Sequence, residues 1–260
     1  MSFLTYVVTQ QAFPKSGTRD YNYKKMFSLS FMAVADAKQR FITVESGASG
    51  SRGDSNIFSK SDFGKKLRND LLNIPSPCPV EGMDGNLPFM FIGDAAYTRT
   101  TNFQTAIKGK HLPVWKSMFN YRLSRARRSV ENAFGILQSR FIILQGPIHG
   151  NRELVKSIIL ACIALHNFHL NNEETVPPAK RKYRPPGYSD YIRADGTYIY
   201  GRWRQENPKQ EDFVFGQLSE IVQDEEKVNE TSSGQKVKGM LMDYFINNPV
   251  SWQFKRFGLL

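Results

Sequence analysis

Acidic side chains occur at three points of this sequence where a metal site could form. Asp94 follows the apolar segment 87–92 and a glycine, and Asp54 follows a Gly/Ser-rich stretch. Glu131 lies in a long segment of helical periodicity, at the border of its apolar stripe. Carboxylate oxygens are the ligands that hard divalent cations prefer. Together the three acids predict an oxygen-lined site for Mg²⁺ or Mn²⁺.

Each acid also has an ordinary structural interpretation. An aspartate after a strand often caps the next loop, and one before a helix, such as Asp54, often caps that helix. Glu131 stands four residues after Arg127, and such a pair stabilises a helix by roughly 0.2–0.5 kcal/mol. Asp36 stands in a turn, where aspartate is favoured whatever the function. On spacing alone, both interpretations stay open.

Basic residues surround the helical glutamate and dominate the charge of the chain. The 260 residues include 35 Lys and Arg against 24 Asp and Glu, a formal net charge of +11. This excess favours a polyanionic partner such as nucleic acid. The arginines expected to contact phosphates are Arg122, Arg125, Arg127 and Arg128. Cations beside an acidic pocket suit a phosphodiester substrate.

Cysteine usage and hydropathy exclude other classes of protein. Cys78 and Cys162 are the only cysteines, too few for a disulfide framework or a zinc site. No apolar run approaches the roughly 20 residues needed to span a bilayer, so no membrane is expected. His166 lies in an apolar segment, where a hydrogen-bonded core histidine is favoured over a metal ligand.

The elements that must position the acids are predicted as strands followed by helices. Residues 1–8 predict a first strand, residues 27–31 a half-buried second strand, and residues 40–44 a third strand after a turn at 36–39. Residues 120–145 repeat apolar positions at steps of three and four, typical of a long amphipathic helix, and Asn151 opens another. This order predicts an α/β fold with a mixed sheet covered by helices.

Composition divides the chain into three parts. Residues 173–190 are rich in proline and carry the basic run Lys180-Arg181-Lys182, which predicts a linker. Residues 1–172 are expected to form the core. Residues 191–260 are expected to form a C-terminal extension that ends in a helix from about 234 to 247.

The segment 119–137, which contains Arg127, Glu131 and Gly135, strongly resembles the final-glutamate helix of the PIF/Harbinger-type DDE transposase-derived nucleases. Other landmarks of that family follow in order: Asn22-Tyr23-Lys24-Lys25, Asp36-Ala37, Gly53-Asp54-Ser55, Gly93-Asp94-Ala95-Ala96-Tyr97, Leu165-His166-Asn167, Asp243-Tyr244-Phe245 and Trp252-Gln253. Each short motif is weak alone, but the ordered set is specific.

The resemblance implies an RNase H-like fold and a DNA endonuclease that uses two Mg²⁺ or Mn²⁺ ions. In this sequence Asp94 matches the strand-end catalytic aspartate and Glu131 the catalytic helical glutamate. Asp54 matches a further metal ligand, and Asp36 matches a recurrent additional acid. The resemblance also implies a nuclear protein, with a cytoplasmic pool allowed, and a separate Myb-like DNA-binding partner protein.

The first catalytic aspartate of the family has no counterpart here. Its strand corresponds to residues 4–11, where Leu4 or a neighbour takes the position, and the first acid, Asp20, lies beyond Pro14. We therefore expect an incomplete first strand and a cost on the order of 10³ in rate. Three interpretations stay open: an impaired nuclease, a domesticated non-catalytic nuclear adaptor for DNA or protein, and a truncated product.

Overall fold

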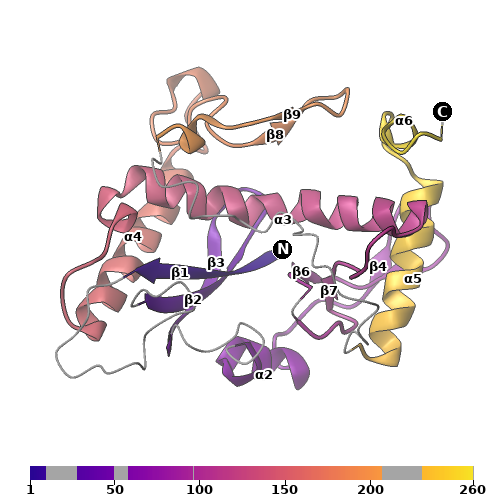
Figure 1. The fold of residues 1–260 in the computed structure, drawn as a ribbon, viewed down its shortest axis with the longest axis horizontal. Helices are drawn as coiled ribbons and strands as arrows, with labels where there is room; N and C mark the ends of the chain where they lie inside the picture. Colours follow the sequence, from indigo (N-terminus) through magenta and orange to yellow (C-terminus); the bar gives the residue numbers. More distant parts are fainter. Residues whose placement is uncertain (10–27, 50–57, 96, 207–229, 260) are drawn as a thin grey trace.

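A five-stranded mixed sheet forms the centre of the fold (Figure 1). The computed structural model describes residues 1–9, 28–49, 58–95, 97–206 and 230–259. The strand order is β3-β2-β1-β6-β7, made of β1 (Ser2–Thr9), β2 (Ser28–Ala35), β3 (Phe41–Ser49), β6 (Phe91–Gly93) and β7 (Phe103–Thr105). β1, β2 and β3 are antiparallel neighbours, whereas β6 and β7 run parallel to β1. The predicted mixed α/β architecture is confirmed.

Strand β2, between β3 and β1, is buried along its whole length, so the prediction of a half-buried strand was wrong. Phe31 and Ala33 pack on the face covered by the long helices, with Phe134 and Ile159. The alternate residues of the strand pack on the opposite face, against helix α2 (Asp62–Arg68). Where both faces of a sheet are covered, a strand has no solvent-exposed face, so the serines of β2 do not indicate exposure to solvent.

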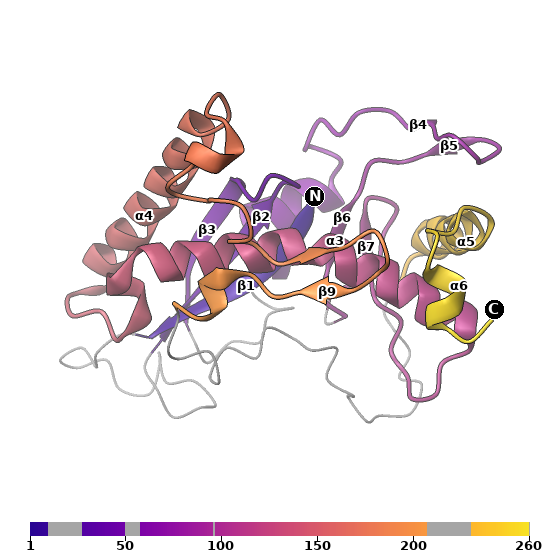
Figure 2. The same cartoon turned by 90° about the horizontal axis from the view of Figure 1, so that it is seen from above.

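Two long helices lie against the sheet (Figure 2). Helix α3 (Val114–Arg140) begins earlier than predicted, directly after Pro113, and ends before a 3₁₀ turn at Ile142–Gln145. Helix α4 (Arg152–Asn172) begins where the sequence predicts, because the Asn151 side chain accepts a hydrogen bond from the Leu154 amide.

Helix α4 is long and apolar enough to cross a membrane by length and composition, which the sequence analysis did not anticipate. Its inner face, with Val155 and Ile159, is part of the buried core beside β2. Its outer face exposes Leu154, Leu165 and Phe168. The packing of the inner face is that of a core helix in a sheet-and-helix layer.

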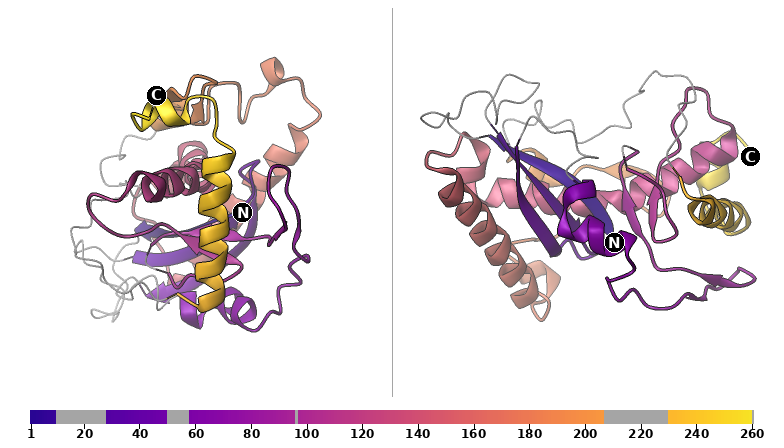
Figure 3. Two further views of the ribbon diagram at one scale, coloured as in Figure 1. Left: turned by 90° about the vertical axis from the view of Figure 1, so that its right-hand side faces the viewer. Right: turned by 90° about the horizontal axis from the view of Figure 1, so that it is seen from below.

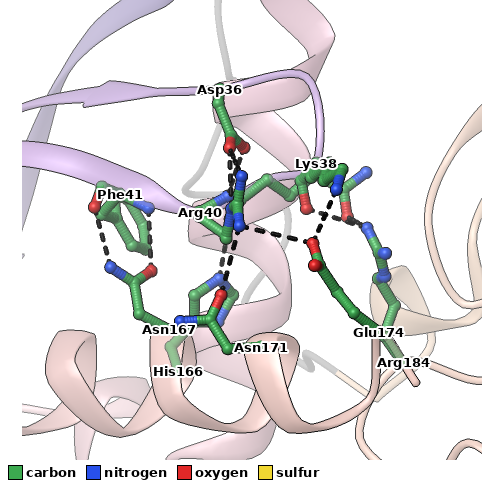
Figure 4. A network of polar contacts seen from close by, with 10 residues as sticks. Asp36, Lys38, Arg40, Phe41, His166, Asn167, Asn171, Glu174 and Arg184 are labelled. Atoms are coloured by element: carbon green, nitrogen blue, oxygen red, sulfur yellow. Dashed lines mark hydrogen bonds and ion pairs between the residues drawn. The ribbon is translucent and has the colours of Figure 1, made fainter. Parts of the chain in front are cut away.

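The Leu165-His166-Asn167 motif fastens α4 to the edge strand β3 (Figure 4). The Asn167 amide accepts from the Phe41 N–H at 2.9 Å and donates to the Phe41 carbonyl at 2.8 Å. His166 Nε2 lies 2.9 Å from the Gln39 carbonyl and therefore donates, so Nδ1 accepts from the Tyr183 hydroxyl. Burial lowers the pKa of His166 to about 4. Both ring nitrogens have structural partners, as the core-histidine interpretation predicts.

The chain after α4 folds back onto the core. The Glu173 carboxylate accepts from the backbone N–H groups of Lys182 and Arg184. Helix α5 (Ser232–Asn247) lies across one end of α3 (Figure 3). The remaining described elements are the hairpins β4 (Cys78–Pro79) with β5 (Asn86–Leu87) and β8 (Tyr191–Ile192) with β9 (Tyr198–Ile199), the 3₁₀ turns at Pro178–Lys180 and Arg202–Arg204, and helix α6 (Gln253–Arg256). The division at 172 and 190 stays a prediction.

Candidate metal and nucleic-acid site

Asp94 leaves the sheet directly after β6. Gly93 ends the strand, and a Cβ there would lie 2.4 Å from the Phe103 ring, so glycine allows this ring to pack beneath the strand end. The Asp94 Oδ1 accepts from the Ala95 N–H at 2.7 Å, and the side chain is 45% exposed. The predicted strand across residues 87–92 is broken at Pro88, since only Phe91–Gly93 pair in the sheet.

Arg127 brings Asp94 and Glu131 to one place. Its Nη2 donates to Glu131 Oε1 at 2.9 Å, and its Nη1 lies 3.7 Å from Asp94 Oδ1. The Arg127 side chain is 7% exposed and that of Glu131 14%. The i,i+4 pair that the structural interpretation predicts is therefore present. The same guanidinium also brings the helical glutamate and the strand-end aspartate together.

The protonation of Glu131 is set by its surroundings. Burial raises the pKa of Glu131, and the cations Arg127, Arg128 and Arg204 oppose this effect, while Asp190 adds to it. A raised pKa means that protons compete for this carboxylate more strongly than for an exposed glutamate. Any cation bound here must compete with those protons and with the Arg127 guanidinium.

Of the other two predicted acids, the structure describes only Asp36, which lies elsewhere. Asp54 lies outside the described residues. Asp36 accepts from the Arg40 backbone N–H at 2.9 Å and forms an ion pair with the Arg40 guanidinium at 2.7 Å, which fixes the turn between β2 and β3 (Figure 4). In the described part of the chain, no three His, Cys, Asp or Glu side chains come close enough to hold a metal.

The register between β1 and β6 bears on the predicted absence of an acid from the first strand, which stays a prediction. Ser2 of β1 pairs with Ile92 of β6 in parallel. Continued by two residues along both chains, this register would put residue 4, a leucine in this sequence, level with Asp94, which follows the last residue of β6. Magnesium is often held by one or two carboxylates, with water completing its shell. Asp94 and Glu131 are two carboxylates of the kind that bind such an ion, and among the described residues no third His, Cys, Asp or Glu forms a metal-binding group with them.

The four arginines predicted to contact phosphates all have partners within the chain. The Arg122 guanidinium lies 4.6 Å from the centre of the Phe245 ring, that of Arg125 4.9 Å from Trp252, and that of Arg128 4.2 Å from Tyr198. Burial lowers the pKa of Arg122 and of Arg125. Arg127 contacts the two carboxylates. Contact of these arginines with DNA stays a prediction.

Sequence reasoning missed a segment that docks beside Glu131. The Asn132 side chain accepts from the Asp190 N–H and from the Trp203 indole N–H, each at 2.9 Å. The buried Asp190 carboxylate in turn accepts from Arg204 and from the Tyr198 hydroxyl. A glycine and a buried asparagine within α3 are unfavourable for an isolated helix. Their presence in the sequence of this helix was the signal from which a segment packed against α3 could have been predicted.

Comparison with known proteins agrees with the motif order. The family model for the DDE superfamily endonuclease matches residues 7–167, more than half of the chain. "Protein ALP1-like" of Arabidopsis thaliana is 27% identical over 158 residues, which are 58% of this chain and 37% of the relative. "Putative nuclease HARBI1" of Homo sapiens is 26% identical over 156 residues, 58% of this chain and 40% of that protein. The matched region thus spans about two fifths of either relative. No solved structure matches significantly.

Proposed function

This chain belongs to the DDE superfamily of endonucleases, and on that premise we propose that it is a metal-dependent DNA nuclease domain with an impaired site. The observation that carries the proposal is the meeting of Asp94 and Glu131 at the Arg127 guanidinium. One acid comes from a strand end and the other from the helix whose motif resembles the final-glutamate helix. Oxygen ligands of this kind suit Mg²⁺ or Mn²⁺.

We also propose that the sheet is RNase H-like. Three antiparallel strands followed by two strands parallel to the first, in the order β3-β2-β1-β6-β7, support this assignment. Helices on both faces of β2 support it further. The arrangement puts β1 in the middle of the sheet, beside β6, the strand that Asp94 follows.

The chemistry would be phosphodiester hydrolysis. A divalent ion bound there polarises a phosphate oxygen and lowers the pKa of its water. Asp94 and Glu131 would hold such an ion, and Glu131 must be ionised to do so. Arg127 contacts both carboxylates, and its positive charge would also stabilise a bound phosphate. Leu4, at the position that the resemblance assigns to the first catalytic aspartate, has no charged side chain and so cannot be a ligand of the ion.

The test is nicking of supercoiled plasmid with Mg²⁺ or Mn²⁺. We expect slow nicking that Asp94→Ala lowers by about 100-fold, because a carboxylate ligand contributes several kcal/mol to such a site. Leu4→Asp should raise the rate by about tenfold or more by adding a carboxylate beside Asp94. Leu4→Asn is the matched control, since it adds polarity without charge. Equal nicking by the original chain, Asp94→Ala and Glu131→Gln would exclude this pair as the source of activity.

A second candidate function is a non-catalytic adaptor for DNA. The observation that favours it is that the Arg127 guanidinium already contacts both acids, where a metal ion would have to bind. Phosphate contacts would then dominate binding, so affinity should fall steeply with salt and should survive Glu131→Ala. Loss of DNA binding in Glu131→Ala together with loss of nicking would instead favour the nuclease.

Nuclear localisation and a Myb-like partner belong to the same proposal. The basic run Lys180-Arg181-Lys182 supports nuclear import, and it follows α4 in the part of the chain that packs back on the core. Replacing the three residues with alanine in a fluorescent fusion should shift it to the cytoplasm. Co-precipitation of a Myb-like protein from nuclear extract would support the partner.

A further inference from the structure

The hairpin β8–β9 presents an exposed aromatic ring at its end. Tyr200 is 69% exposed, directly after β9, and the hairpin lies along α3 (Figures 1 and 2). A large ring left in water loses the stabilisation that burial would provide, about 2 kcal/mol. More than two thirds of its surface is open to solvent, so the ring is accessible to a ligand.

The Tyr200 ring is held in place although it is exposed. The Tyr198 ring lies 4.7 Å from it, at 89°, and the Arg204 guanidinium lies 5.2 Å from its centre. Tyr198 is itself fixed, because its hydroxyl donates to Asp190 at 2.5 Å and Arg128 lies over its ring. An oriented aromatic ring loses little conformational entropy when a ligand binds to it.

The ring belongs to the segment that docks beside the acid pair. Asn132, the residue after Glu131, holds the backbone of Asp190 at both its N–H and its carbonyl. The charges of Asp190 and Arg204 act on Glu131. A phosphate at the acid pair would therefore have near it Arg204, in the turn Arg202–Arg204, whose guanidinium contacts the Tyr200 ring.

We propose that Tyr200 is a stacking platform for one unpaired nucleobase of the DNA whose backbone lies at Asp94 and Glu131. The proposal rests on the proposed function. A base offers a flat π-surface to an aromatic ring, and an adjacent arginine adds cation–π attraction or a phosphate contact. Bases inside a duplex are already stacked on each other, so the platform selects single-stranded or frayed DNA.

The test is fluorescence anisotropy with the 260-residue chain, using labelled oligothymidylate and a blunt duplex of the same length. We expect Tyr200→Ala to weaken binding of the single strand about tenfold and to leave the duplex unchanged. Tyr200→Phe keeps a ring and should bind as the original chain does. The slope of log K against log salt should not change, because no phosphate contact is removed.

Tyr191 is the matched control on the same hairpin. It is 45% exposed, and it pairs with Ile199, so it stands on the opposite face of the ribbon from Tyr198 and Tyr200. Tyr191→Ala should leave both affinities unchanged. Equal losses for the two alanine variants, an equal loss for duplex, or no loss for Tyr200→Ala would overturn the proposal. If Tyr200→Ala acts as expected but the original chain and Asp94→Ala nick equally, the nuclease proposal fails while base stacking stands.

Discussion

The Arg127 guanidinium contacts two carboxylates that come from different elements. A buried arginine beside a buried glutamate contributes little net stability on its own, because both ions lose their hydration. Its effect is positional: it holds α3 and the end of β6 in one arrangement. The ordinary ion pair and the proposed metal site therefore involve the same residues, which is why spacing alone could not separate the two interpretations.

Arg127→Met should destabilise the chain in a pH-dependent way. Loss of the cation raises the pKa of Glu131 beyond the rise that burial causes. The folded state then binds a proton that the unfolded state, with its lower pKa, releases. Stability is thus lost as pH rises above the unfolded value of about 4.5 through the raised folded pKa. We expect a loss of about 3 kcal/mol at alkaline pH and less in acid, measured by urea unfolding.

The double variant Arg127→Met with Glu131→Gln is the control. It removes the buried charge together with its partner, so most of the pH dependence of the loss should disappear. A loss in Arg127→Met that stays the same from acid to alkaline pH would mean that the methylene packing of Arg127, rather than its charge, stabilises the site.

Residue types and motif order singled out Asp94 and Glu131, because a strand-end aspartate and a helical glutamate are visible in the local pattern, and in the structure both contact Arg127. Asp190 was not predictable in this way. It lies in a polar stretch that composition marks as a boundary between linker and extension. Its role comes from contacts with Asn132 and Arg204, which only the folded chain brings together.

At the scale of elements, α3 serves as a docking surface on several sides at once. Phe134 packs into the core beneath the sheet, whereas Asn132 and Gly135 receive the segment after Tyr188. The helical repeat of apolar residues predicted the contact of Phe134 with the core. It did not predict the contacts of Asn132 and Gly135, because a polar residue and a glycine are not part of that repeat. The wrong prediction for β2 has the same origin: its serines indicated a solvent-exposed face, whereas both faces of the strand are buried.

Gly135→Ala should destabilise the chain although it favours the helix. Alanine raises helix propensity by about 1 kcal/mol over glycine, but a Cβ at residue 135 would lie 2.4 Å from the Trp203 ring. Overpacking of this kind costs about 1–3 kcal/mol, so we expect a net loss in urea unfolding. The control is Gly239→Ala in α5, where a Cβ meets nothing within 4 Å and stability should rise by about 1 kcal/mol. A gain at both positions would contradict the docking of Trp203 on α3.

At the scale of the whole molecule, helix α5 of the C-terminal extension covers one end of the core. Val237 and Leu241 of α5 are buried against Phe119 and Leu123 of α3. Arg122 of the same end contacts Phe245 and Gln253. The sequence predicted this helix but not the element that it packs against, because an amphipathic pattern shows only that one face is buried. The described part of the extension thus shares its core with the first 172 residues.

Leu241→Ala therefore tests whether the core and the extension unfold together. Truncation of a buried leucine costs about 2–5 kcal/mol. If the two parts are one cooperative unit, this loss should shift the urea transition seen by circular dichroism and the transition seen by tryptophan fluorescence by the same amount. Hydrogen exchange in α3 should accelerate to the same extent as in α5. Separate transitions, with hydrogen exchange in α3 and β2 unchanged, would instead mean that α5 unfolds independently of the core and that the two parts are divided at the predicted linker.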